Sequence, residues 1–217
     1  GTAGMLRDEF AWVQLIEPGE NAGFTRGNNI GMAASRGRWL LLLNPDTLVL
    51  PGALPRMVEY LDTHPTVGIL GPQLLNEDGS VQSSRRRFPT LWTALFESTW
   101  LQPLAPARVL DRYYMRDVAD DEIALADWVQ GSALMIRRAV LSQVGGFDED
   151  FFMYSEELDW QRRIRSAGWQ VAYYPPAQIV HYGGKSSEQV VAQRHISFQT
   201  SKVRYFRKHH GPLAGFV

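Results

Sequence analysis

The first third of the chain alternates between strand-like apolar runs and helix-like spacing. Residues 38–44 and 67–76 are dominated by apolar side chains, which is typical of buried strands. Between them, residues 53–65 place apolar side chains three and four positions apart, as in a helix that packs by one face. We also expect a short strand over residues 12–18 and a helix of small residues that ends at Gly37. Strands that alternate with helices predict an α/β fold with a largely parallel central sheet.

The rest of the chain is less regular but keeps the same mixture of elements. The Asp78-Gly79 pair predicts a hairpin turn, and residues 83–101 carry three arginines followed by an aromatic helix. Residues 101–122 show no periodic pattern of apolar side chains, which predicts a long irregular segment. The expected elements after it are a strand over 126–138, a short helix with a glycine stop over 139–146, an acidic loop and helix over 147–169, strands over 170–176 and 177–184, and a long basic helix over 187–211.

Composition narrows the classes of protein that this chain can belong to. Its 217 residues suit one large domain, and no repeat or linker divides residues 1–217. A formal net charge of −1 gives no general attraction to nucleic acid, so we expect no nucleic-acid partner. The absence of cysteine excludes disulfides, thiol catalysis and Cys-ligated metals. No apolar run approaches the ~20 residues that span a bilayer.

Asp46 is the first candidate site residue. It follows a run of four leucines on a turn stiffened by Pro45, so its carboxylate lies where a buried strand ends. Ligands of open α/β sheets bind at the carboxyl ends of strands, and a carboxylate there suits a hard divalent cation. The alternative is an ordinary turn or capping acid, because Asp is common in turns.

Three acids at the start of a predicted helix form the second candidate. Glu156, Glu157 and Asp159 follow a loop rich in aromatic residues, with Ser155 as the expected N-cap. Aromatic surroundings lower the local dielectric and raise a carboxylate pKa toward values that suit a general base. The alternative is that these acids only complement the helix dipole.

His181 is the third candidate. It leaves an apolar strand and enters a Gly-Gly turn that is followed by Lys185. A neutral imidazole is a common metal ligand, and the lysine suits an anion. The alternative is a half-buried structural histidine.

Together, three segments resemble a known family. They are NAGFTRGNNIGMAASRGRWLLLLNPDT (21–47), QGSALMIRRAVLSQVGGFDEDFFMYSEELDWQRRIRSAGW (130–169) and HYGGKSS (181–187), in that order. They resemble inverting glycosyltransferases of the GT-A, family-2 type, and most of all the bacterial rhamnosyltransferase-like branch. The resemblance extends from Val13 to Tyr205. It implies a GT-A (nucleotide-diphospho-sugar transferase) fold, with residues 1–85 on the nucleotide-sugar side and residues 86–217 on the acceptor and catalytic side.

The resemblance assigns roles to the polar candidates. The metal motif of the family, Asp-x-Asp, falls on Asn44-Pro45-Asp46, so that Asp46 alone keeps the charge. The late histidine on the metal side falls on His181, and the cation that this pair implies is Mg²⁺ or Mn²⁺. The catalytic base falls on Glu157.

Further residues are assigned in the same way. Asp159 is the next candidate for the base and Glu156 a third. The segment that lines the nucleotide pocket matches Asn21, Gly23 and Asn28, with Lys185 beside the diphosphate. The acceptor side matches Trp128, Gly131 and Ser132.

The implied reaction is transfer of a sugar, with inversion, from a nucleotide-sugar donor to a hydroxyl of a saccharide or lipid-linked acceptor, in bacterial cell-wall or polysaccharide biosynthesis. The implied location is cytoplasmic, with peripheral attachment at the inner face of the plasma membrane as one option.

Two other readings stay open on the sequence alone. One is a GT-A module that binds a glycan or a partner without turnover, which the Asn44 substitution favours. The other is a P-loop or dinucleotide-binding domain, but the glycine spacing of GFTRGNNIG fits neither motif. The resemblance also leads us to expect that a first strand and a nucleobase-binding loop are missing before residue 1. We therefore expect residues 12–18 to form an exposed sheet edge through which chains self-associate.

Overall fold

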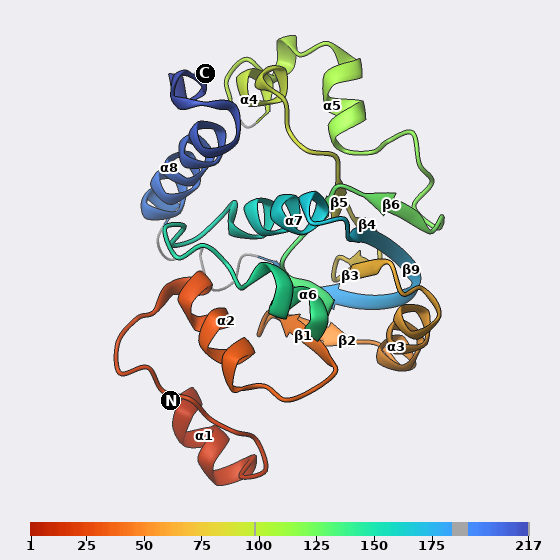
Figure 1. Cartoon of the computed structure of the whole chain (residues 1–217), viewed down its shortest axis with the longest axis vertical. Helices are drawn as coiled ribbons and strands as arrows, with labels where there is room; N and C mark the ends of the chain where they lie inside the picture. Colours follow the sequence, from red (N-terminus) through yellow and green to blue (C-terminus); the bar gives the residue numbers. More distant parts are fainter. Residues whose placement is uncertain (98, 184–190, 217) are drawn as a thin grey trace.

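The computed structural model describes residues 1–97, 99–183 and 191–216, and it shows one central sheet with helices on both faces (Figure 1). Its main strands follow the spatial order β1 (Trp39–Leu43), β8 (Ala133–Arg137), β3 (Val67–Leu75), β9 (Gln170–His181) and β2 (Thr47–Val49). Two short strands extend it, since β4 (Val81–Gln82) pairs with β3 and β6 (Ala124–Ala126) pairs with β9. Separately, β5 (Arg85–Arg86) pairs with β7 (Trp128–Val129).

The predicted α/β class is confirmed, but the prediction of a mostly parallel sheet is wrong. Among the described pairs, only β3 and β9 run parallel; β1–β8, β3–β8, β3–β4, β2–β9 and β6–β9 are antiparallel. The alternation of strands and helices predicts that β1 and β3 run in the same direction. They do, since both are antiparallel to β8. The sequence pattern cannot reveal that β8, from much later in the chain, lies between them.

One long strand replaces two that were expected. β9 contains Pro175 and Pro176, which suggest a break in the sequence, but the strand continues through them with a register shift against β3 at Pro72 and Gln73. Proline, which has no backbone N–H, is tolerated where the hydrogen bonding between two strands is interrupted. The first half of β9 pairs with β6 and its last three residues pair with β2.

Side chains of the sheet alternate between two helical layers. Leu134 and Ile136 of β8 share a cluster with α6 (Arg138–Val144) and α7 (Glu156–Ser166). Met135, between them, packs in the cluster of α3 (Ala53–Thr63) instead. Successive strand residues point to opposite faces, so a five-residue strand serves both layers.

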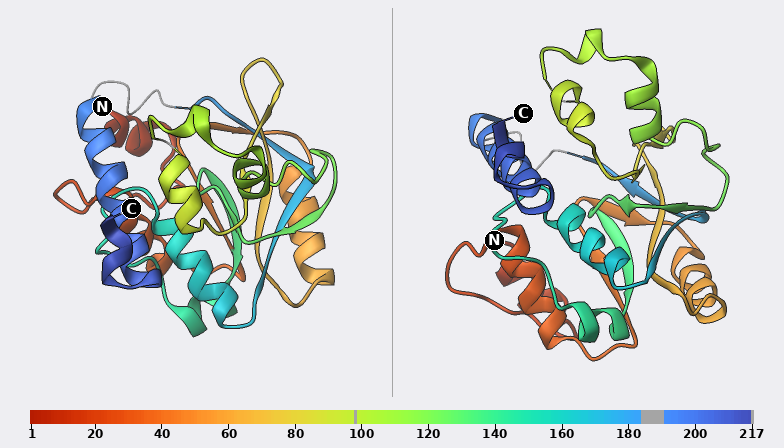
Figure 2. Two further views of the ribbon diagram at one scale, coloured as in Figure 1. Left: turned by 90° about the horizontal axis from the view of Figure 1, so that it is seen from above. Right: turned by 45° about the horizontal axis from the view of Figure 1, so that its top comes forward.

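The remaining helices lie at one end of the sheet and along one side of it (Figures 1 and 2). A separate apolar cluster joins Ala94 of α4 to Tyr205 and Phe206 of α8 and to Leu158 of α7. The bounds of these elements are α2 (Gly23–Ala34), α4 (Leu91–Phe96), η1 (Gln102–Leu104), α5 (Ala107–Tyr113), α8 (Val191–His210) and η3 (Pro212–Phe216).

The N-terminal region differs from the sequence prediction. Residues 12–18 form no strand, and the side chain of Trp12 is 83% exposed. An isolated apolar run has no ladder to join, and its backbone groups are solvated instead. The expected sheet edge at this segment is therefore wrong, and β1 is the strand at that end of the described sheet. An unexpected helix, α1 (Thr2–Glu9), precedes the segment.

Candidate active site

Asp46 and His181 come together at one end of the sheet, as predicted. Thr47 of β2 pairs with His181 of β9, and the backbone N–H of Tyr182 donates to the carbonyl of Asp46. The Nε2 atom of His181 lies 3.5 Å from Oδ1 of Asp46, and the two side chains are 9% and 16% exposed. The turn before Asp46 is closed by the hydroxyl of Thr47, which donates to the carbonyl of Asn44 at 2.6 Å.

A hydrogen-bonded chain in the β3–β4 hairpin fixes the orientation of the His181 ring. The carboxylate of Asp78 accepts from the Ser80 hydroxyl, which in turn accepts from the side-chain amide of Asn76. Asn76 Oδ1 then accepts from Gln82 Nε2 at 3.0 Å, which leaves Gln82 Oε1 to face His181 Nδ1 at 2.7 Å. Because the Asp78 carboxylate can only accept, the Ser80 hydroxyl must donate to it. The donor and the acceptor of each following hydrogen bond, as far as His181, are then fixed.

The consequence is a defined tautomer for His181. Nδ1 carries a proton and donates to Gln82, so in the neutral ring the lone pair is on Nε2, the nitrogen that faces Asp46. Such a partner on the far nitrogen is the usual arrangement behind a metal-ligating histidine. Sequence reasoning missed Gln82, although its position two residues after Ser80, in a hairpin signalled by Asp-Gly, shows that it lies on the strand beside β3.

This pair fits a divalent cation. Neighbouring ligands of an octahedral ion with bonds of ~2.1 Å are about 3 Å apart, close to the observed separation of Oδ1 and Nε2. One carboxylate and one imidazole leave room for further oxygen ligands, and the imidazole favours Mn²⁺ over Mg²⁺. Among the described residues no group of three His, Asp or Glu side chains gathers around one point. Lys185, the predicted diphosphate partner, lies outside the described residues.

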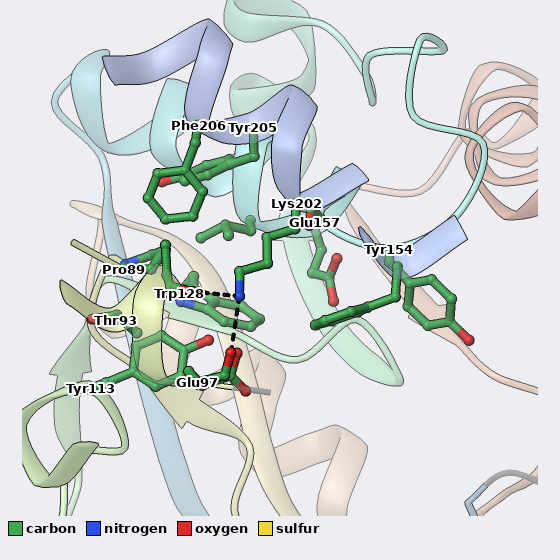
Figure 3. Close-up of a pocket in the computed structure, with 14 residues that line it drawn as sticks. Pro89, Thr93, Glu97, Tyr113, Trp128, Tyr154, Glu157, Lys202, Tyr205 and Phe206 are labelled. Carbon is green, nitrogen blue, oxygen red and sulfur yellow. Dashed lines mark hydrogen bonds between the residues drawn. The ribbon is translucent and has the colours of Figure 1, made fainter. Parts of the chain in front are cut away.

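Glu157 lies at the start of α7 and points into a cavity of about 100 Å³ (Figure 3). Its Oε2 atom is buried without a hydrogen-bond partner in the described structure. Burial raises the pKa of this carboxyl above its usual range, although the nearby backbone N–H groups of Glu157, Gly131 and Leu158 lower it in part. A buried carboxylate with an unpaired oxygen, on a residue that lines a cavity, is suited to accept a proton.

A buried glutamine holds α7 against β7. One turn after Glu157, Gln161 accepts from the N–H of Val129 at 2.8 Å and donates to its carbonyl at 2.7 Å. The side chain of Gln161 is fully buried. This bidentate contact ties the helix that carries Glu157 to the segment that carries Trp128 and Gly131. Sequence reasoning missed Gln161, although a polar residue four positions after Glu157, on the same helix face, was a signal.

The backbone immediately before Glu156 is strained. Tyr154 and Ser155 both have positive φ values, 68° and 62°, and neither is glycine. Left-handed conformations of such residues persist only where the surroundings enforce them, and they cluster at functional sites. Ser155 is the N-cap of α7, as predicted, although its side chain makes no capping hydrogen bond.

Asp159 faces away from this cavity. Its carboxylate is fully buried and accepts from Lys208 at 2.8 Å, His209 at 2.7 Å and Arg163 at 3.0 Å. Burial alone would raise its pKa, but the hydrogen bonds outweigh that effect and lower the pKa to about 2. Residues two positions apart lie on opposite sides of a helix, so Glu157 and Asp159 cannot share one site.

Glu156 is buried as well, and its Oε2 has no hydrogen-bond partner in the described structure. Burial and the neighbouring Glu157 raise its pKa. It does not line the cavity that Glu157 enters.

The predicted acceptor-side residues surround Glu157. Trp128 lines the same cavity, and its indole N–H donates to the carbonyl of Arg87. A side chain on Gly131 would reach the Glu157 Cβ at 3.5 Å, so this glycine lies directly against the acid. The carbonyl of Ser132 accepts from the N–H of Asn44 at 2.8 Å. The turn between β7 and β8 thus connects Glu157 on one side to the Asp46 turn on the other.

Of the residues predicted to line the nucleotide pocket, Gly23 and Asn28 lie on α2 and Asn21 lies just before it. Asn21 accepts the N–H of Gly23, which has a φ of 67°, and a side chain on Gly23 would meet the ring of Phe152 at 2.6 Å. Gly23 and Asn28 line a groove of about 550 Å³ between α2 and β1. Asn29 couples α2 to the loop before α7, because its amide bonds the backbone of Phe147 in both directions. The groove therefore lies beside the Asp46 turn but apart from Glu157.

Comparisons with known proteins identify relatives of this chain. The profile of a family described as "Glycosyltransferase like family 2" matches residues 5–195. N-acetylglucosaminyl-diphospho-decaprenol L-rhamnosyltransferase of Mycobacterium tuberculosis is 31% identical over 198 residues, covering 86% of this chain and 64% of its own length. Rhamnosyltransferase WbbL of Escherichia coli K12 is 24% identical over 86% of this chain and 70% of its own length. The chain thus spans less than two thirds of the mycobacterial relative.

Solved structures share the fold. GalNAc-T7, solved with UDP, GalNAc and Mn²⁺, superimposes with a TM-score of 0.64 at 15% identity, over 94% of this chain and 39% of its own. The mannosyltransferase PcManGT of Pyrobaculum calidifontis, solved with GDP-Man and Mn²⁺, gives a TM-score of 0.58 at 17% identity, over 96% of this chain and 51% of its own. The predicted GT-A fold is confirmed. The profile match covers most of the chain, and the chain belongs to glycosyltransferase family 2.

Proposed function

We propose that this protein transfers a sugar, with inversion, from a nucleotide-diphosphate sugar to a hydroxyl group of a saccharide or lipid-linked acceptor. The observation that carries the proposal is the placement of Glu157. Glu157 lines a cavity and its Oε2 is buried without a hydrogen-bond partner in the described structure, while its neighbour Gly131 is next to Ser132, whose carbonyl bonds the turn that presents Asp46. This arrangement supports a base and a leaving-group site on the two sides of one backbone turn.

Glu157 acts as the general base in this proposal. Its Oε2 accepts the proton of the acceptor hydroxyl while that oxygen attacks the anomeric carbon from the face opposite the diphosphate. Burial raises the pKa of the carboxyl, which makes it a stronger proton acceptor than an exposed acid. The nearby backbone N–H groups of Gly131 and Leu158 keep the rise in its pKa from being larger. Asp159 is unsuited to this role, because its carboxylate already accepts from Arg163, Lys208 and His209.

Asp46 and His181 hold the leaving-group side. Their facing Oδ1 and Nε2 atoms would bind Mn²⁺ or Mg²⁺, a cation that supplies charge stabilisation to the departing diphosphate. Gln82 keeps the Nε2 lone pair directed at this site. Gly23 and Asn28 line the groove proposed for the nucleoside, Asn21 lines a separate hollow before α2, and Trp128 offers an aromatic face to the acceptor sugar.

The decisive experiment is a panel of nucleotide sugars assayed with Mn²⁺, for release of nucleoside diphosphate and for transfer. We expect one donor to be turned over, and Asp46→Asn to abolish turnover while the thermal unfolding midpoint stays unchanged. Asp46 lies at a strand end and makes no core contact, so the variant tests chemistry instead of folding. Unaltered turnover by a folded Asp46→Asn protein would contradict the assignment.

A second candidate function is binding without turnover. The Asn44 substitution favours it, since Asn44 supplies no charge and its N–H serves the fold by bonding Ser132. The same panel of nucleotide sugars distinguishes a transferase from a binding module. Saturable donor binding by calorimetry, with no diphosphate release from any donor, would identify a binding module.

A further inference from the structure

The described residues between 89 and 106 (89–97 and 99–106) lie at the end of the molecule that carries α4 and α5 (Figure 1). By sequence, the 18 positions from 89 to 106 contain a single ionisable side chain, Glu97. Trp92 is 64% exposed, Trp100 is 85% exposed and Leu104 is 70% exposed. Large apolar side chains exposed together on one short segment are unusual for a surface that faces only water.

The one acid of this segment does not belong to its outer surface. Glu97 lines the cavity that Glu157 enters, and its carboxylate accepts from the hydroxyl of Tyr114 (Figure 3). Lys202 of α8 donates to the backbone carbonyls of Ala94 and Glu97, at 2.8 Å and 2.9 Å, and so fastens the segment from inside. The exposed side of residues 89–106 is therefore free of fixed charge.

Cationic side chains follow directly. Arg108 and Arg112 are exposed on α5 and lie four residues apart, on one face of that helix. The acid between them, Asp111, is paired with Arg116 at 2.7 Å. An uncharged, tryptophan-bearing surface bordered by arginines has the composition of a protein face that lies at a lipid headgroup layer, because indole rings and guanidinium groups both favour that zone.

We propose that residues 89–106, with Arg108 and Arg112, dock on the surface of an anionic lipid bilayer. Trp92, Trp100 and Leu104 insert at the headgroup level, and the two arginines pair with lipid phosphates. The underside of the same segment lines the Glu157 cavity through Thr93, Ala94 and Glu97. That this placement holds a lipid-linked acceptor hydroxyl near Glu157 rests on the proposed function. The docking of the segment on a bilayer does not.

The test is co-sedimentation of the chain with vesicles of phosphatidylcholine, with and without phosphatidylglycerol, in the absence of donor and acceptor. We expect binding to the anionic vesicles only, weakened by salt. Trp92→Ser combined with Trp100→Ser should weaken binding by at least ~10-fold, the effect of leaving about 60 Å² of apolar surface outside the bilayer. Arg108→Gln with Arg112→Gln should remove most of the dependence on phosphatidylglycerol.

Trp12→Ser is the matched control, because Trp12 is 83% exposed but lies near α1, in a different region of the chain. It should leave vesicle binding unchanged, and circular dichroism should show that every variant folds. The proposal is overturned if the unaltered chain does not bind anionic vesicles, or if Trp12→Ser weakens binding as much as the double variant. It is equally overturned if the double variant only dissociates a dimer in sedimentation, since the face would then belong to a second copy. Loss of vesicle binding with turnover of a soluble acceptor intact would leave the proposed function standing.

Discussion

At the scale of single residues, two neighbouring acids of α7 have opposite environments. Glu157 has a raised pKa because it is buried beside a cavity, and Asp159 has a pKa of about 2 because hydrogen bonds from His209, Lys208 and Arg163 outweigh its burial. Substitution of Glu157 should therefore lower activity and raise stability, whereas substitution of Asp159 should chiefly lower stability.

Glu157→Gln should lower kcat by ~10²–10⁴-fold, the usual effect of losing a general base. It should also stabilise the protein at neutral pH. A carboxyl with a raised pKa binds its proton more tightly when folded, so its contribution to stability is largest below the unfolded pKa and falls as pH rises toward the folded pKa. We expect a thermal midpoint a few degrees higher at pH 7.5 and no gain near pH 4.

The matched control for this prediction is Glu156→Gln. Glu156 is also buried with a raised pKa, but it does not line the cavity. It should stabilise the protein without loss of turnover. Equal loss of turnover in both variants would contradict the assignment of the base to Glu157.

Asp159→Asn should lower the free energy of unfolding by about 2 kcal/mol, because Arg163, Lys208 and His209 lose a charged acceptor, and their hydrogen bonds to it lower the pKa of Asp159 from 3.8 to about 2. The stabilisation from Asp159 is complete above its unfolded pKa and disappears as pH falls through the folded value of about 2. Urea denaturation at pH 7 measures the change. Asp150→Asn is the control, since Asp150 is 74% exposed and its pair with Arg204 should contribute little. A larger loss of kcat than in Glu157→Gln would move the base to Asp159.

At the scale of elements, local patterns were predictable and partners from distant sequence were not. Helix α3 and strand β3 are predicted by the spacing of their apolar residues alone. Helix α6 has Gly145 (φ 79°) as its C-cap, where a glycine stop was expected. The position of β8 between β1 and β3 depends on a pairing across about 70 or more residues, which no local pattern contains. The Asp46–His181 pair was foreseen from motifs, but Gln82 and Gln161 act through tertiary contacts that appear only in three dimensions.

The β3–β4 hairpin gives a prediction at this scale. Gln82→Met removes the acceptor for His181 Nδ1, and the imidazole should then lose its single tautomer. We expect nitrogen chemical shifts of the His181 ring, recorded by NMR without metal, to show a mixture, and Mn²⁺ affinity to fall by ~10–100-fold. Gln82→Glu, which keeps an acceptor, should retain the tautomer. A single unchanged tautomer in Gln82→Met would show that the hairpin has no positioning role.

At the scale of the whole molecule, β1 has a strand partner on one side only within the described structure. Beyond its other side lies the groove under α2, and Leu43 is 41% exposed. Unpaired strand edges recruit other chains, so we predict concentration-dependent self-association through β1. No helix in the described part of the chain has the length and apolar character to cross a membrane.

Leu43→Lys should suppress this association, because a charge on an edge strand opposes pairing. Light scattering over a range of protein concentrations measures the effect. Leu54→Lys is the control, since Leu54 is 38% exposed on α3 and lies on no edge. Equal oligomer content in both variants would exclude β1 as the interface.

The path of the chain from α7 into β9 has a consequence for how such proteins diversify. Glu157 near the start of α7 and His181 at the end of β9 belong to one contiguous stretch of 25 residues, whereas α4, η1 and α5 are contributed by residues 91–113. A single recombination event can therefore carry the proposed base and one of the two proposed metal ligands, His181, into a new chain together, while Asp46 is inherited separately. Helices α4 and α5, which line the proposed acceptor cavity, also come from elsewhere in the chain, so acceptor choice can change by exchange of these helices while Glu157 and His181 remain matched to each other.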